Sequence, residues 1–360
     1  MRFPEFSGEW NKYTINDLAT VVGGGTPDTT VKSYWGGDIQ WFTPSEIGKN
    51  KYVDFSKRTI TRDGLDNSSA KLLPLHTILL SSRATVGECS IASNECTTNQ
   101  GFQSLIAKQC NIDFLYYLIQ TKKKDLIRNA CGSTFLEISA NEIRKIKVAV
   151  PVQNEQEQIA KLLSLIDERI ATQNKIIEKL QSLIKGLAVA LTTKEKANIA
   201  ISQCLECHSS TLQESEVLSS GLCKVFGANG LVGYKDVPQM NGDAILVIKD
   251  GSGVGTVSYA QGKFSVIGTL NYLTVIGNND LRYLYFALSV FNFQPYKTGM
   301  AIPHIYFKDY GKAKIYCPSL AEQKRVANVL DKLESKLFVE QELLASFNQQ
   351  KLYLLGKMFI

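Results

Sequence analysis

The chain has 360 residues, 44% hydrophobic and 21% charged, which is typical of a folded protein large enough for two domains. Its net charge of +6 permits a polyanionic partner without proving one. No apolar run reaches the ~18 residues that a membrane span needs, and residues 1–13 have no signal-peptide core, so we expect a cytoplasmic protein with reduced cysteines.

The first 150 residues predict a loop-rich α+β domain. The run Gly23-Gly24-Gly25 is expected to break regular structure and to let the backbone approach a ligand closely. A helix is predicted over 113–129 as the one helix of this domain. Alternating or β-rich residues predict strands at 39–43, 58–61, 77–81, 88–92, 102–106 and 144–150.

From Pro151 to about Leu191 the sequence predicts a coiled-coil helix. Apolar residues recur at steps of three and four, and Gln173 fills the one polar step. At 1.5 Å per residue such a helix is roughly 55 Å long, and its narrow apolar stripe needs a partner helix. The pattern Asn154-x-x-Glu157 offers a capped helix start.

The second half repeats this order after a linker at 192–198. Asn229-Gly230 predicts a hairpin within 225–234, and the glycine-rich stretch 251–255 predicts a tight hairpin rather than a nucleotide-binding loop. Two strands (244–248 and 256–259), a helix (281–291) and a last strand (312–316) are expected. A second heptad helix starts at Pro318, with Ser319-x-x-Glu322 as a capping box.

The two halves are related by a constant difference in residue number, the difference between Pro151 and Pro318, which we call the repeat offset. Pro151 matches Pro318, and Gly132–Pro151 aligns with Gly299–Pro318 without a gap. We therefore predict an α+β fold: two tandem, pseudo-symmetric globular domains separated by two long antiparallel coiled-coil helices. The expected domains are 1–150 and 193–317, and the expected helices are 151–192 and 318–360. The helix-pair interface is predicted to contain Ile166, Ile170, Ile177, Leu180, Leu187, Leu333, Leu337, Leu344, Phe347 and Leu354.

Known catalytic patterns are missing from the sequence. The segment Cys204–His208 spells a haem-attachment pattern, but without a signal peptide or a second cysteine pair we attribute it to chance. No phosphate-binding GxxxxGK[ST] loop, amino-methyltransferase tetrapeptide, nuclease motif, catalytic triad or metal-ligand spacing occurs. We therefore expect no catalytic residue and no metal site.

The layout resembles the specificity subunits of type I restriction–modification systems over essentially the whole chain. The most specific element is the Pro-x-x-x-Glu-Gln start of each long helix. The other matching segments are GGGTPDT (23–29), GGDIQWFTPSEI (36–47), LLSSRATVGECSI (79–91), TTNQGF (97–102), VAVPVQNEQEQIAKLLSLID (148–167), FGANGLVGY (226–234), GSGVGTVSYA (251–260) and CPSLAEQKRVANVLDKLE (317–334).

This resemblance implies a non-catalytic reader of double-stranded DNA. Each domain would be a target-recognition domain for one half of a split, asymmetric site, and the helices would space the two domains and dock two methyltransferase subunits. Those partners would bind S-adenosylmethionine, and restriction subunits that use ATP would cut unmodified DNA. The alternatives are a coiled-coil adaptor, a DNA-binding protein without a methyltransferase partner, and an enzyme that acts on DNA by itself.

Candidate DNA contacts are polar and basic loop residues. Arg83 follows an apolar strand and could grip a phosphate or a guanine edge, and an amide such as Asn99 could read adenine. For each of these residues, a plain solvated loop is an equally good interpretation. The candidates are Thr26, Lys32, Ser45, Arg83, Thr85, Asn99, Gln100, Lys249, Ser252, Asn271, Lys297 and His304.

Overall fold

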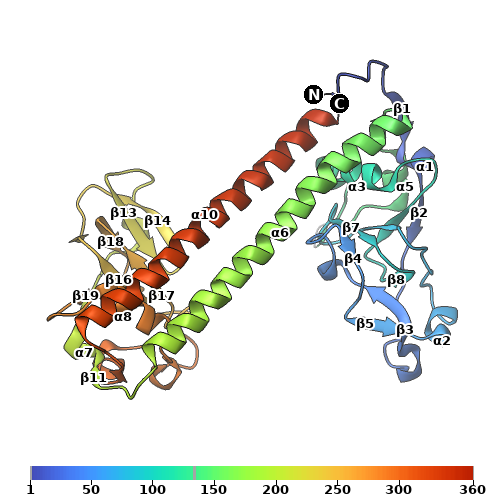
Figure 1. Ribbon diagram of the computed structural model, residues 1–360. Coiled ribbons are helices and arrows are strands. Elements are labelled where there is room, and N and C mark those ends of the chain that lie inside the picture. Colours follow the sequence, from blue (N-terminus) through green and yellow to red (C-terminus); the bar gives the residue numbers. More distant parts are fainter. Residues whose placement is uncertain (1, 133–134, 360) are drawn as a thin grey trace. The chain divides into compact units, whose positions relative to one another are not determined.

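The computed structural model describes residues 2–132 and 135–359. The chain divides into two compact units: unit 1 is Met1–Gln173 with Leu343–Ile360, and unit 2 is Asn174–Glu342. Each unit contains one globular domain and a part of each of two long helices, α6 (Gln153–Thr192) and α10 (Leu320–Met358) (Figure 1). The division therefore falls within the helices, whereas the predicted boundaries gave each helix a segment of its own.

Within each unit the two long helices pack side by side in opposite directions. In unit 1 the first half of α6 meets the end of α10, where Lys351 Nζ lies 2.7 Å from Asp167 Oδ1. In unit 2 the end of α6 meets the start of α10, and Ala188 shares an apolar core with Ala327 and Leu330. The predicted α+β fold, with two repeated domains and two long antiparallel helices, is confirmed.

The heptad positions of both helices turn away from solvent. Gln173 and Glu340, the polar steps, are only 5% and 7% exposed, and the Glu340 carboxylate pairs with Lys336 at 2.5 Å. A buried polar residue in such a seam restricts the register of the pair. The predicted interface residues that are buried are Ile166, Ile177 and Leu354, and those that are half-buried are Ile170, Leu180, Leu187, Leu333, Leu337, Leu344 and Phe347.

Among the described residues of unit 1 the strands form three sheets, with the orders β2-β9-β6-β7-β4, β5-β3-β8 and β1-β10. Its strands are β1 (Asn11–Thr14), β2 (Ala19–Gly23), β3 (Trp35–Phe42), β4 (Tyr52–Val53), β5 (Arg58–Ile60), β6 (Ile78–Leu80), β7 (Cys89–Ala92), β8 (Cys96–Thr98), β9 (Gln103–Ala107) and β10 (Lys147–Val150). Its short helices are α1 (Ile15–Leu18), η1 (Lys32–Tyr34), η2 (Pro44–Glu46), α2 (Arg62–Asp66), α3 (Ile112–Thr121), α4 (Lys123–Arg128) and α5 (Ala140–Lys145).

Unit 2 repeats this plan with the orders β12-β19-β16-β17, β14-β13-β18-β15 and β11-β20. Its strands are β11 (Ile199–Ala200), β12 (Leu205–Ser209), β13 (Cys223–Gly227), β14 (Gly230–Lys235), β15 (Met240–Asn241), β16 (Ala244–Ile248), β17 (Val257–Ala260), β18 (Lys263–Val266), β19 (Leu270–Val275) and β20 (Lys314–Ile315). Its short helices are α7 (Ile201–Cys204), η3 (Glu214–Glu216), α8 (Leu281–Ser289), η4 (Gln294–Tyr296) and α9 (Phe307–Tyr310).

Several local predictions need correction. The helix expected over 113–129 is interrupted at Lys122, between α3 and α4, and it is not the one helix of its domain. The start of the strand expected over 144–150 belongs to α5. Asn154 lies inside α6 and cannot cap it, whereas Ser319 Oγ does accept the Glu322 N–H at 3.4 Å. The two hairpins expected around Gly230 and over 251–255 are confirmed.

The repeated glutamine at each long-helix start ties that helix to its domain. Gln156 Nε2 donates to the Pro151 carbonyl at 2.9 Å, and its Oε1 accepts the N–H of Asn111, the cap of α3, at 3.0 Å. Gln323 makes the same two bonds, to the Pro318 carbonyl and from the Asp280 N–H, each at 2.8 Å. Asn111 is therefore the counterpart of Asp280, whereas the repeat offset would pair Asp280 with Asp113.

Candidate nucleic-acid interface

Two loops meet beside the end of β6 in unit 1. The Ala84 N–H donates to the Leu136 carbonyl at 3.1 Å, and the Ile138 N–H donates to the Ser82 carbonyl at 2.9 Å. The Arg83 guanidinium lies 3.8 Å from the Glu137 carboxylate, and both side chains are about half exposed. We call Ser82–Ala84 together with Phe135–Ile138 the paired-loop site of unit 1. Backbone bonds hold this site; Ser82 and Ile138 are buried, and the residues between them in the two loops, including Arg83, Phe135 and Glu137, are exposed to solvent.

Unit 2 has the same arrangement at the repeat offset. The Gly251 N–H donates to the Pro303 carbonyl, and the Ile305 N–H donates to the Lys249 carbonyl, both at 2.9 Å. The paired-loop site of unit 2 is therefore Lys249–Gly251 together with Ile302–Ile305. The backbone also matches, because Ala84 (φ 62°) and Gly251 (φ 98°) both adopt the left-handed region. A non-glycine residue seldom adopts this conformation, which marks the loop at Ala84 as a candidate functional segment.

The two sites carry different side chains at equivalent positions. Arg83 and Glu137 of unit 1 correspond to Asp250 and His304 of unit 2, which form a β-bridge at the same place. Arg83 thus corresponds to an acidic residue, and Lys249 corresponds to Ser82. The two domains therefore share a backbone frame but present different hydrogen-bonding groups.

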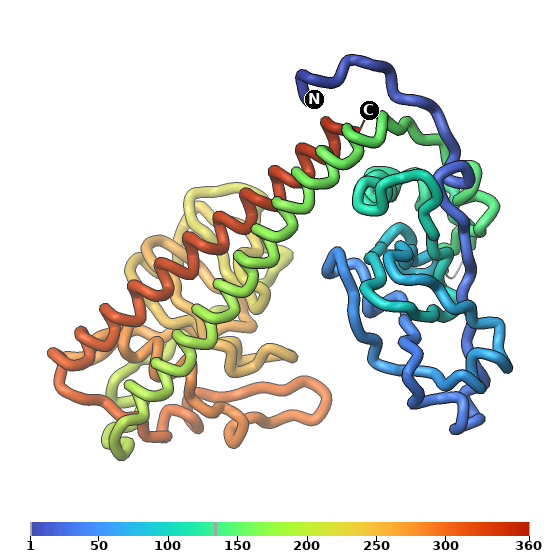
Figure 2. The backbone as a smooth tube through the Cα atoms, turned by 45° about the vertical axis from the view of Figure 1, so that its right-hand side comes forward, coloured from blue at the N-terminus to red at the C-terminus, as the bar shows by residue number. Residues whose placement is uncertain are grey.

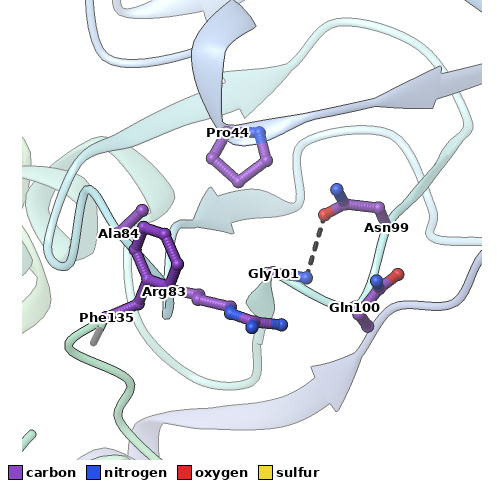
Figure 3. A pocket seen from close by; sticks show the side chains of 7 residues that line it. All are labelled: Pro44, Arg83, Ala84, Asn99, Gln100, Gly101 and Phe135. Carbon is purple, nitrogen blue, oxygen red and sulfur yellow. Dashed lines mark hydrogen bonds between the residues drawn. The ribbon is translucent and has the colours of Figure 1, made fainter. Parts of the chain in front are cut away.

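A cavity of about 250 Å³ opens beside the paired-loop site of unit 1 (Figure 3). Asn99 and Gln100 lie on one side, and the Asn99 Oδ1 accepts the Gly101 N–H at 2.9 Å. The residues that line the cavity are Pro44, Arg83, Ala84, Asn99, Gln100, Gly101 and Phe135. The cavity therefore combines an apolar lining with one guanidinium and two amides, the side chains that hydrogen-bond best to guanine and adenine.

The glycine run packs against its own chain rather than a ligand. A Cβ on Gly24 would lie 2.1 Å from the Asn99 carbonyl oxygen, and the Gly25 N–H donates to the Thr98 carbonyl at 2.8 Å. The Gly25 carbonyl accepts the Trp41 indole N–H at 2.9 Å. The backbone at Gly24 therefore does approach another segment closely, but that segment is the β8–β9 loop of the same chain, and the expected approach to a ligand stays a prediction. This packing places Thr26 where its Oγ1 donates to Gln100 Oε1 at 2.5 Å.

Most of the predicted contacts of unit 1 gather at this cavity. Arg83, Asn99 and Gln100 line it, and Thr26 bonds Gln100. The other residues nearby are Ser45, which is exposed and follows Pro44 in η2, and Thr85, which is exposed with its Oγ1 2.9 Å from Ser81 Oγ. Lys32 is also exposed, but it lies on the separate turn η1.

In unit 2 the structure brings four of the five candidates to the paired-loop site. Lys249 and His304 belong to it, Ser252 follows Gly251, and Lys297 precedes Thr298, whose N–H donates to the His304 carbonyl at 2.9 Å. Asn271 is different. Its side chain is 4% exposed, and its Oδ1 accepts the Ser209 hydroxyl at 2.9 Å. Burial and this bond argue against Asn271 as a base contact, and we assign it to the sheet.

Our sequence reasoning missed Phe135 and Ile302, which are 59% and 67% exposed. They occupy equivalent positions in the two paired-loop sites, because the repeat offset separates them. The gap-free alignment of Gly132–Pro151 with Gly299–Pro318 already placed both in corresponding loops. The sequence therefore already contained the signal for this pair, but apolar residues were not among the candidate DNA contacts, which are all polar or basic.

The cysteine–histidine segment Cys204–His208 covers the end of α7 and most of β12 in unit 2. His208 sits on β12, its ring stacks on Tyr272 at 4.8 Å, and its Nε2 lies 2.9 Å from Thr274 Oγ1. Within residues 2–132 and 135–359, no group of three or more His, Cys, Asp or Glu side chains is arranged to hold a metal ion. In the same part of the chain, no helix is both long enough and apolar enough to cross a membrane.

Known proteins share this arrangement. A family model described as "Type I restriction modification DNA specificity domain" matches residues 7–182 and 208–349. The chain belongs to this specificity family. One relative is the type I restriction enzyme MjaIX specificity subunit of Methanocaldococcus jannaschii, 39% identical over 183 residues, which are 48% of this chain and 42% of that protein. Another is the EcoprrI specificity subunit of Escherichia coli, 24% identical over 360 residues, covering 91% of this chain and 88% of the relative.

The match therefore spans less than half of the first relative and most of the second. Among solved structures, a type I restriction–modification S subunit from M. genitalium aligns over 100% of this chain and 99% of its own, with a TM-score of 0.66 and 19% identity. A chain from a structure that addresses complex assembly of the type I R-M system has a TM-score of 0.59 at 14% identity and covers 98% of each chain. At these identities the likeness shows that the fold of the specificity family is shared.

Proposed function

We propose that this member of the specificity family reads a bipartite, asymmetric site in double-stranded DNA, one half-site per globular domain. The observation that carries the proposal is the paired-loop site, which occurs twice on the same backbone frame with different side chains. Two domains with the same backbone frame can approach one DNA duplex in the same way. Their different side chains can then recognise two different half-sites. The net charge of +6 favours approach to the phosphate backbone.

In unit 1 the cavity supplies the chemistry for reading bases. Arg83 can donate two hydrogen bonds to the O6 and N7 atoms of a guanine, and the amides of Asn99 and Gln100 suit the N6 and N7 atoms of an adenine. Thr26 and Ser45 are hydroxyl donors for phosphate oxygens, which fix register without reading sequence. In unit 2, Lys249, Ser252, Lys297 and His304 are the corresponding candidates.

The long helices supply the docking surface in this proposal. Besides the buried seam, they carry exposed apolar residues, including Ile176 and Leu343, which are 38% and 40% exposed. The repeat offset also relates these two, so they occupy equivalent positions on α6 and α10. Apolar surface that is repeated on both helices fits two copies of one partner. We propose that these partners are two methyltransferase subunits and that restriction subunits join the complex through them. Further exposed apolar residues of the helices are Leu165, Leu183, Val189, Val329, Phe338, Val339, Leu352 and Tyr353.

The chain itself has no catalytic role in this proposal. S-adenosylmethionine and ATP belong to the partner subunits, and the complex works in the cytoplasm on chromosomal and incoming DNA. Methyl transfer by the purified chain alone, given S-adenosylmethionine and duplex DNA, would contradict this and support an independent enzyme.

Co-expression with a candidate methyltransferase subunit, followed by mapping of methylated adenines, tests the proposal and supplies the site. Binding of that duplex should weaken steeply with salt. Arg83→Ala should weaken specific binding by about 1–3 kcal/mol if the arginine reads a base. Arg169→Ala, at an exposed position on α6, is the control and should leave binding unchanged. Absence of salt-dependent binding to any duplex would favour the adaptor instead.

A further inference from the structure

Both paired-loop sites expose a large apolar side chain at the same position. Phe135 is 59% exposed, and Ile302, its counterpart, is 67% exposed. In unit 2 a second apolar residue, Met300, is fully exposed nearby. The residue type differs between the repeats, but the apolar character and the exposure are the same. A single exposed apolar residue is common on protein surfaces, but its repetition at equivalent positions of both units, beside the candidate DNA contacts, favours a shared partner surface.

The backbone fixes this exposure. In unit 2 a short hairpin is closed by two bonds of 2.9 Å between Thr298 and His304, and Gly299 (φ 86°) makes the turn. A Cβ on Gly299 would lie 2.3 Å from the Ile302 carbonyl oxygen. Figure 2 shows this part of the chain, around residue 300 (orange), as a loop that extends from its unit. Ile302 is thus presented on a braced hairpin.

Unit 1 has the same bracing. Cys131 and Glu137 exchange two backbone hydrogen bonds of 2.9 Å, and a Cβ on Gly132 (φ 132°) would lie 2.1 Å from the Phe135 carbonyl oxygen. Figure 3 shows the Phe135 ring on the same side of the cavity as Ala84 and Arg83. The apolar side chain therefore stands beside the guanidinium that we assign to base reading.

We propose that Phe135 and Ile302 are wedges that insert between neighbouring base pairs, one in each half-site. This inference rests on the proposed function and adds apolar insertion to its polar readers. Phe, Ile and Met are among the apolar side chains that proteins insert to pry apart a base step, and such insertion partly unstacks the step and kinks the duplex. The neighbouring charges favour DNA as the partner, because Arg83 in unit 1 can donate to a base edge and Lys249 and Lys297 in unit 2 can hold phosphates.

The insertion can be measured with the full-length chain and a duplex that carries the mapped site. 2-Aminopurine replaces an adenine at successive steps of each half-site, and its fluorescence rises where a neighbouring base is unstacked. The wild-type chain should raise the fluorescence at one step in each half-site. Phe135→Ala should abolish the rise in one half-site only, and Ile302→Ala in the other. Phe135→Ala should weaken binding about tenfold, within the range that stacking of an aromatic ring on a base contributes, and Ile302→Ala should also weaken it.

Two controls match the exposure of the wedges. Leu75→Ala changes a residue that is 51% exposed at the opposite end of β6, and Leu222→Ala changes one that is 84% exposed before β13. Both should bind and unstack DNA like the wild type. Circular dichroism of all variants should be unchanged, because the altered side chains lie outside the cores.

The outcomes separate this inference from the proposed function. If the wild type binds the mapped duplex with the expected salt dependence but gives no fluorescence rise at any step, the wedge is refuted and the DNA reader stands. If replacing thymine by uracil weakens binding as much as Phe135→Ala does, the phenyl ring packs on a thymine methyl group and the insertion is again refuted. If the wild type binds no duplex, both proposals fail.

Discussion

Replacing Gln156 by alanine tests how each long helix is fastened to its domain. The side chain is 4% exposed and bridges the Pro151 carbonyl at 2.9 Å and the Asn111 N–H at 3.0 Å. Alanine leaves both groups without this partner, one buried and one partly buried. A buried polar group without a hydrogen bond costs about 1–3 kcal/mol, so we expect Gln156→Ala to lower the free energy of unfolding by about 2–4 kcal/mol.

Urea unfolding followed by tryptophan fluorescence reports this change selectively. The chain has 3 tryptophans, Trp10, Trp35 and Trp41, and all of them lie in unit 1, where Gln156 is. Gln158→Ala, on the exposed face of the same helix, is the matched control and should change stability by less than about 0.5 kcal/mol.

A second variant separates hydrogen bonding from packing. Gln156→Glu keeps the shape of the side chain but replaces the donor to the Pro151 carbonyl by an oxygen, so it should also be destabilising. If Gln156→Ala and Gln158→Ala unfold with the same free energy, the glutamine bridge contributes nothing, and the repeated Pro-x-x-x-Glu-Gln segment needs another explanation.

Three further changes test other contacts. Arg2→Ala should lower the urea midpoint of unit 1, because the buried Glu155 carboxylate loses two hydrogen bonds of 2.6 Å, and Arg2→Lys should restore only part of the loss. Gly24→Ala should destabilise unit 1 through the clash with the Asn99 carbonyl, whereas Gly186→Ala, inside α6 with open space around it, should stabilise by roughly 0.5–1 kcal/mol; equal effects would contradict the packing described for Gly24. An alkylating reagent at pH 7.5 should label the exposed Cys131 in the native chain, as mass spectrometry can show. Burial raises the pKa of three other thiols to about 12, so they stay protonated and should react only after unfolding; they are Cys89, Cys96 and Cys110.

The repeat and the long helices could be predicted from the sequence because their signals are local and periodic. Heptad spacing of apolar residues identifies the buried side of a helix pair from the sequence alone. The repeat offset also relates the residues that form the backbone hydrogen bonds of the two paired-loop sites. The repeat offset pairs Asp280 with Asp113, two residues from its structural counterpart, because the caps of the two helices differ in type, Asn111 in one unit and Asp280 in the other. The bonds of Gln156 and Gln323, which decide the matter, join residues more than forty positions apart.

The candidate site was harder to predict because exposure depends on pairing between distant strands. Arg83 was correctly expected to project from a loop at the end of a strand. Asn271 is an asparagine like Asn99, but it lies on β19, which pairs with β12 on one side and β16 on the other. Its side chain is therefore buried within the sheet. Strand β8 was missed because its three residues have little pattern of their own, and its parallel pairing with β3 joins segments far apart in the chain. Composition alone cannot reveal such an environment.

The frame around Arg83 and its counterpart Asp250 is held mainly by main-chain bonds, which do not depend on the type of side chain. Under the proposed function, point substitutions at these two positions should change the preferred DNA sequence with little effect on folding. Because each domain has a frame of its own, such a change in one domain should leave the preference of the other intact.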